Sequence, residues 1–432
     1  MDALTDLDID ALGARAEAML CELAAISAEP DRLVRLFLTR EHRRAADLVA
    51  RFMREAGLEV SEDALGTVRG RLPGGGENHR RLLIGSHIDT VIDAGRYDGP
   101  LGVIAGVLAA GHVARRGGSR CGIEVLAFGD EEGSRFPSTL SSSAAVAGVF
   151  DPRVLALADR DGITFAQALA AYGKHPQDIA AAAIPAQEAA AYVEVHIEQG
   201  PRLEAADLPL GVVTAIAGQS RFRVTITGEA GHAGTVPMAL RRDALAAAAE
   251  MMLELEHIAL AHAADGMVAT VGELRVLPGA SNVIPGRVEL TVDLRSASDP
   301  ERRAAVTAFK AHAAEIAGWR HCALAIEDLH EVAGTPCDPA LQAMLGEAAA
   351  GLDLRTLALP SGAGHDGQMM ARLCPAAMLF VRCRGGISHN PREFANERDM
   401  GLAIATLIGF IERFDPDRLR SSGSERKDPP AP

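Results

Sequence analysis

The sequence predicts an α/β protein with two domains: a main domain whose mostly parallel sheet is flanked by helices, and a smaller α+β domain inserted into it. The continuous apolar segments RLLIG (81–85) and IEVLAF (123–128) are separated by a helical pattern, as in parallel sheets buried on both faces. Near Gly211 polar and apolar residues begin to alternate strictly, and the first pattern returns from about Val332. The predicted boundaries are 1–215 and 332–413 for the main domain and 216–331 for the insertion.

The main domain starts with a helix over 41–57, which has one apolar face and reaches Gly57, a residue typical of helix ends. A strand ending near Val60 and the buried strand 81–85 follow. The later elements are a helix over 100–116, a strand over 123–128 and, after the insertion, a helix, a strand over 378–381 and an amphipathic helix over 399–413. The polar segment 414–432 is predicted to be disordered.

The inserted domain begins with RFRVTITG (221–228), in which Phe222, Val224 and Ile226 alternate with polar residues. This period of two indicates a strand with one solvated face. The other predicted elements are a helix near 241–262, strands over 267–275 and 287–295, and a helix near 300–318.

Composition and charge restrict the class of protein. Of the 432 residues, 48% are hydrophobic and 23% are charged, which is typical of folded globular chains. A net charge of −15 argues against nucleic acid as a partner, and no apolar segment reaches the about 20 residues that a membrane-spanning helix needs. Residues 1–20 are acidic, unlike a secretory signal, and the six cysteines form no CxxC pair. We therefore expect a cytoplasmic protein without membrane or nucleic-acid partners.

Histidine and acidic residues are concentrated at predicted strand ends and in loops. They lie in GSHIDT (85–90), RYDGPLG (96–102), GDEEGSRF (129–136), VEVHIEQG (193–200) and GISHNPREF (386–394). Singly, each has a structural role that would account for it: a turn aspartate caps its own backbone, and adjacent glutamates are commonly solvated. Because sites in α/β sheets collect beyond the carboxyl ends of strands, the whole set instead predicts a functional site.

Metal chemistry explains these residue types. Imidazole and carboxylate ligands without a thiolate indicate Zn²⁺, Mn²⁺, Co²⁺ or Ni²⁺. A carboxylate that bridges two ions would form a site that activates water for hydrolysis. The side chains of the adjacent Glu131 and Glu132 are expected to diverge, so that one binds metal while the other accepts the proton of the water.

Together these segments resemble the dinuclear metallo-aminoacylase and peptidase superfamily, specifically its carbamoyl-hydrolase branch, over about residues 30 to 413. This branch contains N-carbamoyl-L-amino-acid hydrolases, β-ureidopropionases and allantoate amidohydrolases. The resemblance implies two divalent metal ions per subunit, one bound by His87, Asp98 and His196 and the other by Asp98, Glu132 and His389, with Asp98 as the bridge. It also implies Glu131 as the general base and Asp89 as the residue that orients His87.

The residue at position 196 and the inserted domain extend this resemblance. Peptidases of the superfamily usually carry a carboxylate where this chain has His196, followed by IEQG. The segment GEAGHAGTVPMALRRDA (228–244) resembles one in which a His acts across a homodimer interface to polarise the scissile carbonyl, here His232. The insertion would then be a dimerisation and lid domain. The implied substrate-binding residues are Gln199, Arg221, Asn282, Arg295 and His365, and the planar Arg295 suits a substrate carboxylate.

Two segments favour allantoate as the substrate. LSSSAAVAG (140–148) lacks the Arg that many carbamoylases carry after a Gly-Ser pair, and VIDAGRYDG (91–99) resembles allantoate enzymes more than the carbamoylase form VPNGGRFDG. The prediction is a two-metal amidohydrolase that cleaves the carbamoyl (ureido) C–N bond of a small anionic substrate. The alternatives are an N-carbamoyl-L-amino-acid hydrolase or a β-ureidopropionase. From a different class, a catalytically inactive metal-dependent scaffold that binds carboxylates is disfavoured, because a pure binder needs no base beside its ligands.

Overall fold

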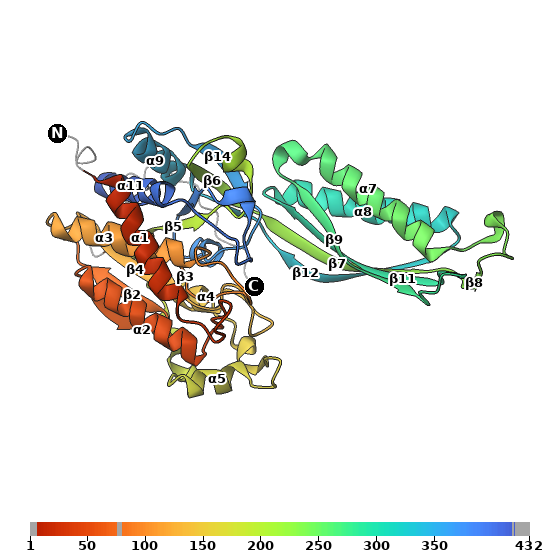
Figure 1. Cartoon of the computed structure of the whole chain (residues 1–432), viewed down its shortest axis with the longest axis horizontal. Helices are drawn as coiled ribbons and strands as arrows, with labels where there is room; N and C mark the ends of the chain where they lie inside the picture. The colour runs from red at the N-terminus through yellow and green to blue at the C-terminus, as the bar shows by residue number, and fades with distance from the viewer. Residues whose placement is uncertain (1–6, 76–79, 417–418, 420–432) are drawn as a thin grey trace. The chain divides into compact units, whose positions relative to one another are not determined.

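The computed structural model describes residues 7–75, 80–416 and 419, which form two compact units (Figure 1). Within the described residues, unit 1 consists of the chain up to Thr214, Cys337–Leu359 and the chain from His365 onward, and unit 2 consists of Ala215–Pro336 and Pro360–Gly364. The segment 360–364, assigned to the main domain from sequence, lies in unit 2 because the Ala217 amide donates a 2.9 Å hydrogen bond to the Ser361 carbonyl. Most of the tail 414–432, predicted to be disordered, lies outside the described residues. In the described part of the chain, no helix is long and apolar enough to span a membrane.

The large sheet has the order β1-β2-β4-β3-β5-β15-β6-β13, and β14 also pairs with β6. Its central strands β4, β3, β5 and β15 run parallel, and its outer pairs are antiparallel, so the prediction of a mostly parallel sheet in an α/β fold is confirmed. The strands are β1 Glu59–Glu62, β2 Val68–Leu72, β3 Arg81–His87, β4 Gly122–Phe128, β5 Ala189–Ile197, β6 Leu210–Ile216, β13 Thr335–Pro336, β14 Leu357–Ser361 and β15 Ala376–Val381.

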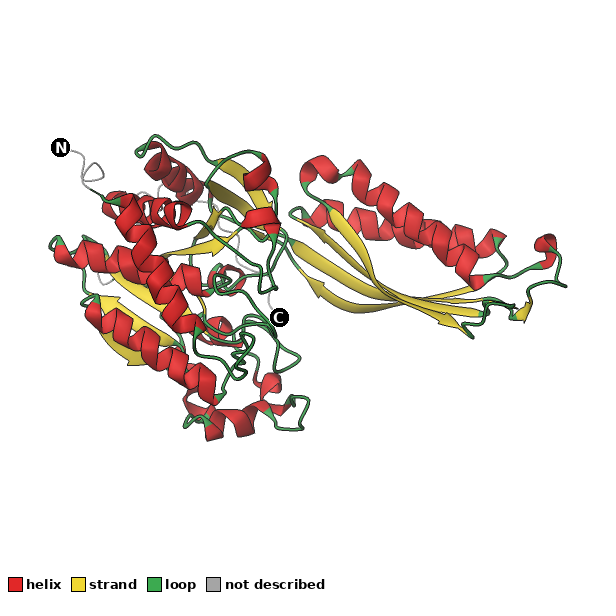
Figure 2. Ribbon diagram, viewed as in Figure 1, coloured by secondary structure: helices red, strands yellow, loops and turns green. Residues whose placement is uncertain are grey.

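Helices flank this sheet, as Figure 2 shows. They are α1 Ile9–Ala24, α2 Arg40–Glu55, α3 Pro100–Arg115, α4 Ser141–Val146, α5 Phe165–Ala171, α6 Arg202–Ala205, α9 Pro339–Ala350, α10 Gly367–Met370 and α11 Glu397–Arg413, with 3-10 turns η2 Pro152–Ala156, η3 Pro176–Ala182 and η6 Arg384–Gly386. α3 is apolar on almost every side and is buried in the main core, whereas the amphipathic α2 buries one face. α2 is followed by Gly57, whose φ of +86° is typical of a residue after a helix end.

Unit 2 is an antiparallel sheet of order β12-β7-β11-β9 with two long helices on one face (Figure 2). Its elements are β7 Gly218–Thr227, β8 Gly231–His232, η4 Met238–Leu240, α7 Ala244–Ala261, η5 Ala263–Asp265, β9 Val268–Leu277, β10 Val283–Ile284, β11 Arg287–Ser296, α8 Asp299–Trp319 and β12 Ala323–Val332. The alternating Phe222, Val224 and Ile226 are buried beneath the helices, as predicted. Sequence analysis missed β12, an edge strand that is mostly exposed and therefore carries a weak apolar pattern.

Candidate metal centre and active site

The parallel strands of unit 1 bring the predicted ligands together. His87 is the last residue of β3, and His196 is the next-to-last residue of β5. Glu131 and Glu132 follow β4, and His389 lies in the loop after β15. Because neighbouring parallel strands end at one edge of the sheet, side chains distant in sequence converge there.

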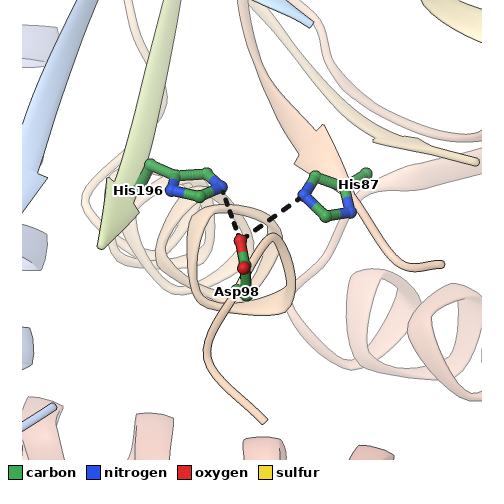
Figure 3. A group of neighbouring side chains, drawn as sticks. All are labelled: His87, Asp98 and His196. Carbon is green, nitrogen blue, oxygen red and sulfur yellow. Dashed lines mark ion pairs between the residues drawn. The ribbon is translucent and has the colours of Figure 1, made fainter. Parts of the chain in front are cut away.

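The first group of candidate ligands is His87, Asp98 and His196, all buried (Figure 3). Asp98 Oδ1 lies 3.2 Å from His196 Nε2 and 3.9 Å from His87 Nε2. His196 Nδ1 lies 2.9 Å from the Ile197 carbonyl oxygen. That contact makes Nδ1 a hydrogen-bond donor and leaves Nε2 as the nitrogen that faces Asp98.

The second group is Asp98, Glu132 and His389. His389 Nε2 lies 3.3 Å from Asp98 Oδ2 and 3.4 Å from Glu132 Oε2. The two oxygens of Asp98 therefore face different groups, which is the arrangement expected of a bridging carboxylate. The groups differ in exposure, since the side chain of His389 is 51% exposed and that of His196 only 1%.

Glu131 lies beside both groups. Its Oε2 is 3.8 Å from His87 Nε2, and its side chain is 12% exposed. Asp89 stands behind these residues: its Oδ1 is 3.4 Å from His87 Nδ1, and its two oxygens accept 3.2 Å hydrogen bonds from the backbone amides of Glu131 and Glu132. One buried carboxylate thus fixes the orientation of His87 and the path of the adjacent loop.

The donor set fits divalent cations. His196 Nε2 is buried 3.2 Å from Asp98 Oδ1, as expected for two ligands that converge on an ion. Burial, followed by the charge of Asp98, raises the pKa of Glu132 to about 7, and burial also raises the pKa of Glu131 well above its usual range. Three carboxylates in one buried cluster repel one another unless positive charge compensates them.

Two local backbone features adapt the chain to this cluster. Gly99 has a φ of +83°, and a Cβ atom there would overlap the ring of His87, so only glycine allows this packing. Gln199 and His389 have φ values of +56° and +52°, in the left-handed region that non-glycine residues rarely adopt. Backbone strain of this kind clusters at functional sites.

Of the residues predicted to bind substrate, Gln199 and His365 lie in unit 1. Gln199 Nε2 donates a 2.8 Å hydrogen bond to Asp98 Oδ2, so this side chain contacts the proposed bridge directly. The ring of the buried His365 packs edge-on against that of His196, with 4.5 Å between the centroids. Burial, followed by the nearby His196, holds the pKa of His365 well below its usual range.

Arg221 and Arg295 lie in unit 2, on neighbouring strands. Both contact Asp293: Arg221 Nε is 2.9 Å from Oδ2, and Arg295 donates two 3.0 Å hydrogen bonds to the same carboxylate. Arg295 Nη1 also donates to the Gly362 carbonyl at 2.7 Å. Sequence reasoning missed Asp293, although it lies two residues before Arg295.

His232 is the last residue of β8 in the small antiparallel β8–β10 sheet of unit 2, where it pairs with Val283, and Asn282 directly precedes β10. His232 is exposed, and its Nδ1 accepts a 3.0 Å hydrogen bond from the Gly234 amide. Nε2 of the neutral ring is therefore the protonated nitrogen, available as a donor. Asn282 contributes its backbone carbonyl, which accepts from the Ala233 amide.

Two further residues of unit 1 were missed. Ser388 Oγ lies 2.6 Å from Asp98 Oδ2, and the buried Glu393 accepts from the backbone amides of Tyr97 and Asp98. Both lie in GISHNPREF, but serine and glutamate are common in solvated loops and do not by themselves indicate a site. Only the fold shows that this segment lies against the Asp98 loop.

A family model described as Peptidase family M20/M25/M40 matches residues 83–413. The chain belongs to this family. A probable allantoate deiminase of Oryza sativa subsp. japonica is 41% identical, covering 94% of this chain and 89% of the rice protein. An N-carbamoyl-L-amino acid amidohydrolase of Geobacillus stearothermophilus is 42% identical, covering 92% of this chain and 98% of that protein.

A solved structure agrees with these relatives. The hydantoinase/carbamoylase-family amidase of Burkholderia multivorans is 35% identical, with a TM-score of 0.86, and the match covers 93% of this chain and 97% of that one. The chain is therefore a family member of the amidohydrolase type, which acts on C–N bonds other than peptide bonds.

Proposed function

We propose that the chain is a two-metal amidohydrolase that cleaves the carbamoyl C–N bond of allantoate, releasing ammonia and carbon dioxide and leaving a ureido product. The division of the two Asp98 oxygens between two groups of candidate ligands carries this proposal. When bound, two divalent ions would polarise the ureido carbonyl and activate a water molecule. Zn²⁺, Mn²⁺, Co²⁺ and Ni²⁺ suit imidazole and carboxylate donors.

His87, Asp98 and His196 would hold one ion, and Asp98, Glu132 and His389 the other. Glu131 would accept the proton of the attacking water and pass it to the leaving nitrogen. Its position beside both groups and its burial support this role, because a desolvated carboxylate is a stronger base than one in water. Asp89 would keep the loop of Glu131 and Glu132 in place through their amides.

Unit 2 would bind the substrate carboxylate. Two guanidinium groups, of Arg221 and Arg295, share the single carboxylate of Asp293, which leaves excess positive charge and keeps both side chains ordered. Gln199, Asn282 and His365 would supply further polar contacts with the substrate.

We also propose that the chain is a homodimer in which His232 completes the active site of the other subunit and polarises the carbonyl from Nε2. Exposed apolar side chains support self-association: Leu253 and Leu260 on α7 are 57% and 64% exposed, and Val268 and Leu274 on β9 are 52% and 47% exposed. β9 is also an edge strand, with unpaired backbone groups along one side. All six cysteines are free, which supports a cytoplasmic location.

An experiment must distinguish between the candidate substrates, since allantoate and N-carbamoyl-amino-acid enzymes are almost equally similar to this chain in sequence. The allantoate-like segments 91–99 and 140–148 favour allantoate. The test measures kcat/KM of the metal-loaded protein on allantoate, several N-carbamoyl-L-amino acids and β-ureidopropionate. We expect the highest value for allantoate. If kcat/KM is higher for an N-carbamoyl-L-amino acid, that compound and not allantoate is the substrate. If none of these compounds is turned over, the result would favour a scaffold that only binds carboxylates.

A further inference from the structure

Glu393 links two loops that carry candidate metal ligands. Its Oε1 accepts hydrogen bonds from the backbone amides of Tyr97 at 2.8 Å and Asp98 at 3.1 Å. Its Oε2 lies 3.0 Å from Ser388 Oγ, which itself lies 2.6 Å from Asp98 Oδ2. Glu393 therefore contacts Asp98 in two ways, directly at the backbone and through Ser388 at the side chain.

The chain is shaped to accept this carboxylate. The Glu393 residue is only 5% exposed, and a Cβ atom on Gly95 would overlap its side chain. The Glu393 amide donates a 3.0 Å hydrogen bond to the Asn390 carbonyl, which closes a turn directly after His389. A buried carboxylate beside the acidic Asp98 costs electrostatic free energy, so packing alone does not explain it.

We propose that Glu393 is a positioning residue for the metal centre: it holds Asp98 and the His389 loop in the geometry that binds both ions. This inference rests on the proposed two-metal site and extends it to a residue that belongs to neither group of candidate ligands. Since Asp98 belongs to both groups, loss of Glu393 should weaken both ions together. By contrast, loss of His389 removes a ligand from the second group alone.

The test is the titration of metal-free protein with Co²⁺, followed by the visible absorption of the bound ion and by competition with a chelator. In Glu393→Ala we expect about 10- to 100-fold weaker binding at both positions and an altered Co²⁺ spectrum. Glu393→Gln retains an oxygen that can accept from the two amides and should keep most of the affinity. Ser388→Ala, which removes only the hydroxyl link, should also weaken binding about tenfold or more.

Asp338→Ala is the matched control. Asp338 Oδ1 likewise accepts two backbone hydrogen bonds, from Ala340 at 3.0 Å and Leu341 at 3.1 Å, but at the start of α9. This variant should lose stability without losing Co²⁺ affinity. The inference is overturned if folded Glu393→Ala binds Co²⁺ with wild-type affinity and spectrum, or if Asp338→Ala weakens binding equally.

Two other outcomes are also decisive. If Glu393→Ala does not fold, the Co²⁺ affinity of Ser388→Ala becomes the test. Wild-type Co²⁺ affinity in Ser388→Ala then overturns the inference. Failure of the proposed function looks different: the wild-type protein would then bind no Co²⁺, or would bind it without turning over any ureido substrate.

Discussion

Acidification should destabilise unit 1 through His42, a fully buried histidine of α2. Burial lowers the pKa of His42 to about 4; the nearby Asp89 opposes this shift, while Arg35 and Arg43 add to it. Its Nδ1 lies 2.9 Å from the Tyr172 hydroxyl, and its Nε2 is buried without a hydrogen-bond partner. The folded state therefore keeps the ring neutral, whereas the unfolded chain binds a proton near the ordinary histidine pKa of about 6.5.

The sign and size of the pH effect on the unfolding free energy follow from the difference in proton binding between the folded and unfolded states. The contribution of neutral His42 is complete above pH 6.5 and is lost progressively as the pH falls toward 4, because the unfolded state binds more protons in that window. Between pH 7 and pH 5 the loss amounts to about 2 kcal/mol of unfolding free energy.

The assay is urea unfolding at both pH values, with chelator present so that metal release does not contribute. The loss on acidification should be about 2 kcal/mol smaller in His42→Gln than in wild type. His257→Gln is the control, because this side chain is 71% exposed and its ring is solvated in both states. An equal pH effect in wild type and His42→Gln would refute the reasoning.

Three further predictions concern the catalytic centre. Glu131→Gln should lower kcat by roughly 10²–10⁴ with unchanged metal content by elemental analysis, and full activity would refute its role as base. Chelation should abolish turnover, which Mn²⁺, Co²⁺, Ni²⁺ or Zn²⁺ should restore. Asp98→Ala should lose both ions, whereas His389→Ala should lose one. Equal metal contents in these two variants would contradict the role of Asp98 as the bridging ligand. Mixing inactive His232→Ala and Glu131→Gln subunits should restore part of the activity, since one site of each heterodimer is intact, and verified heterodimers without activity would exclude action in trans.

The sequence predicted the fold class and the place of a functional site for the same physical reason, whereas the grouping of the candidate ligands was implied by the family resemblance. Buried parallel strands are continuous apolar segments, and residues that follow them meet at one sheet edge, so His87, Glu131 and Glu132 could be placed at such a site from the sequence. The side chains that contact the predicted site residues could not be predicted in this way. Asp293 contacts Arg221 because the two lie opposite each other in the β7–β11 pairing, and a strand register is not visible in either segment alone.

Protons and metal ions would compete for the candidate ligands. The hydrogen bond with Asp98, together with nearby carboxylates, raises the pKa of His389 to about 9, while burial raises that of Glu132 to about 7. A proton on His389 or Glu132 would occupy a lone pair that a metal ion needs. A ligand must lose its proton before it can bind a cation, so ion binding by this cluster necessarily releases protons. The crowding of carboxylates in this cluster therefore favours cation binding and would make it dependent on pH.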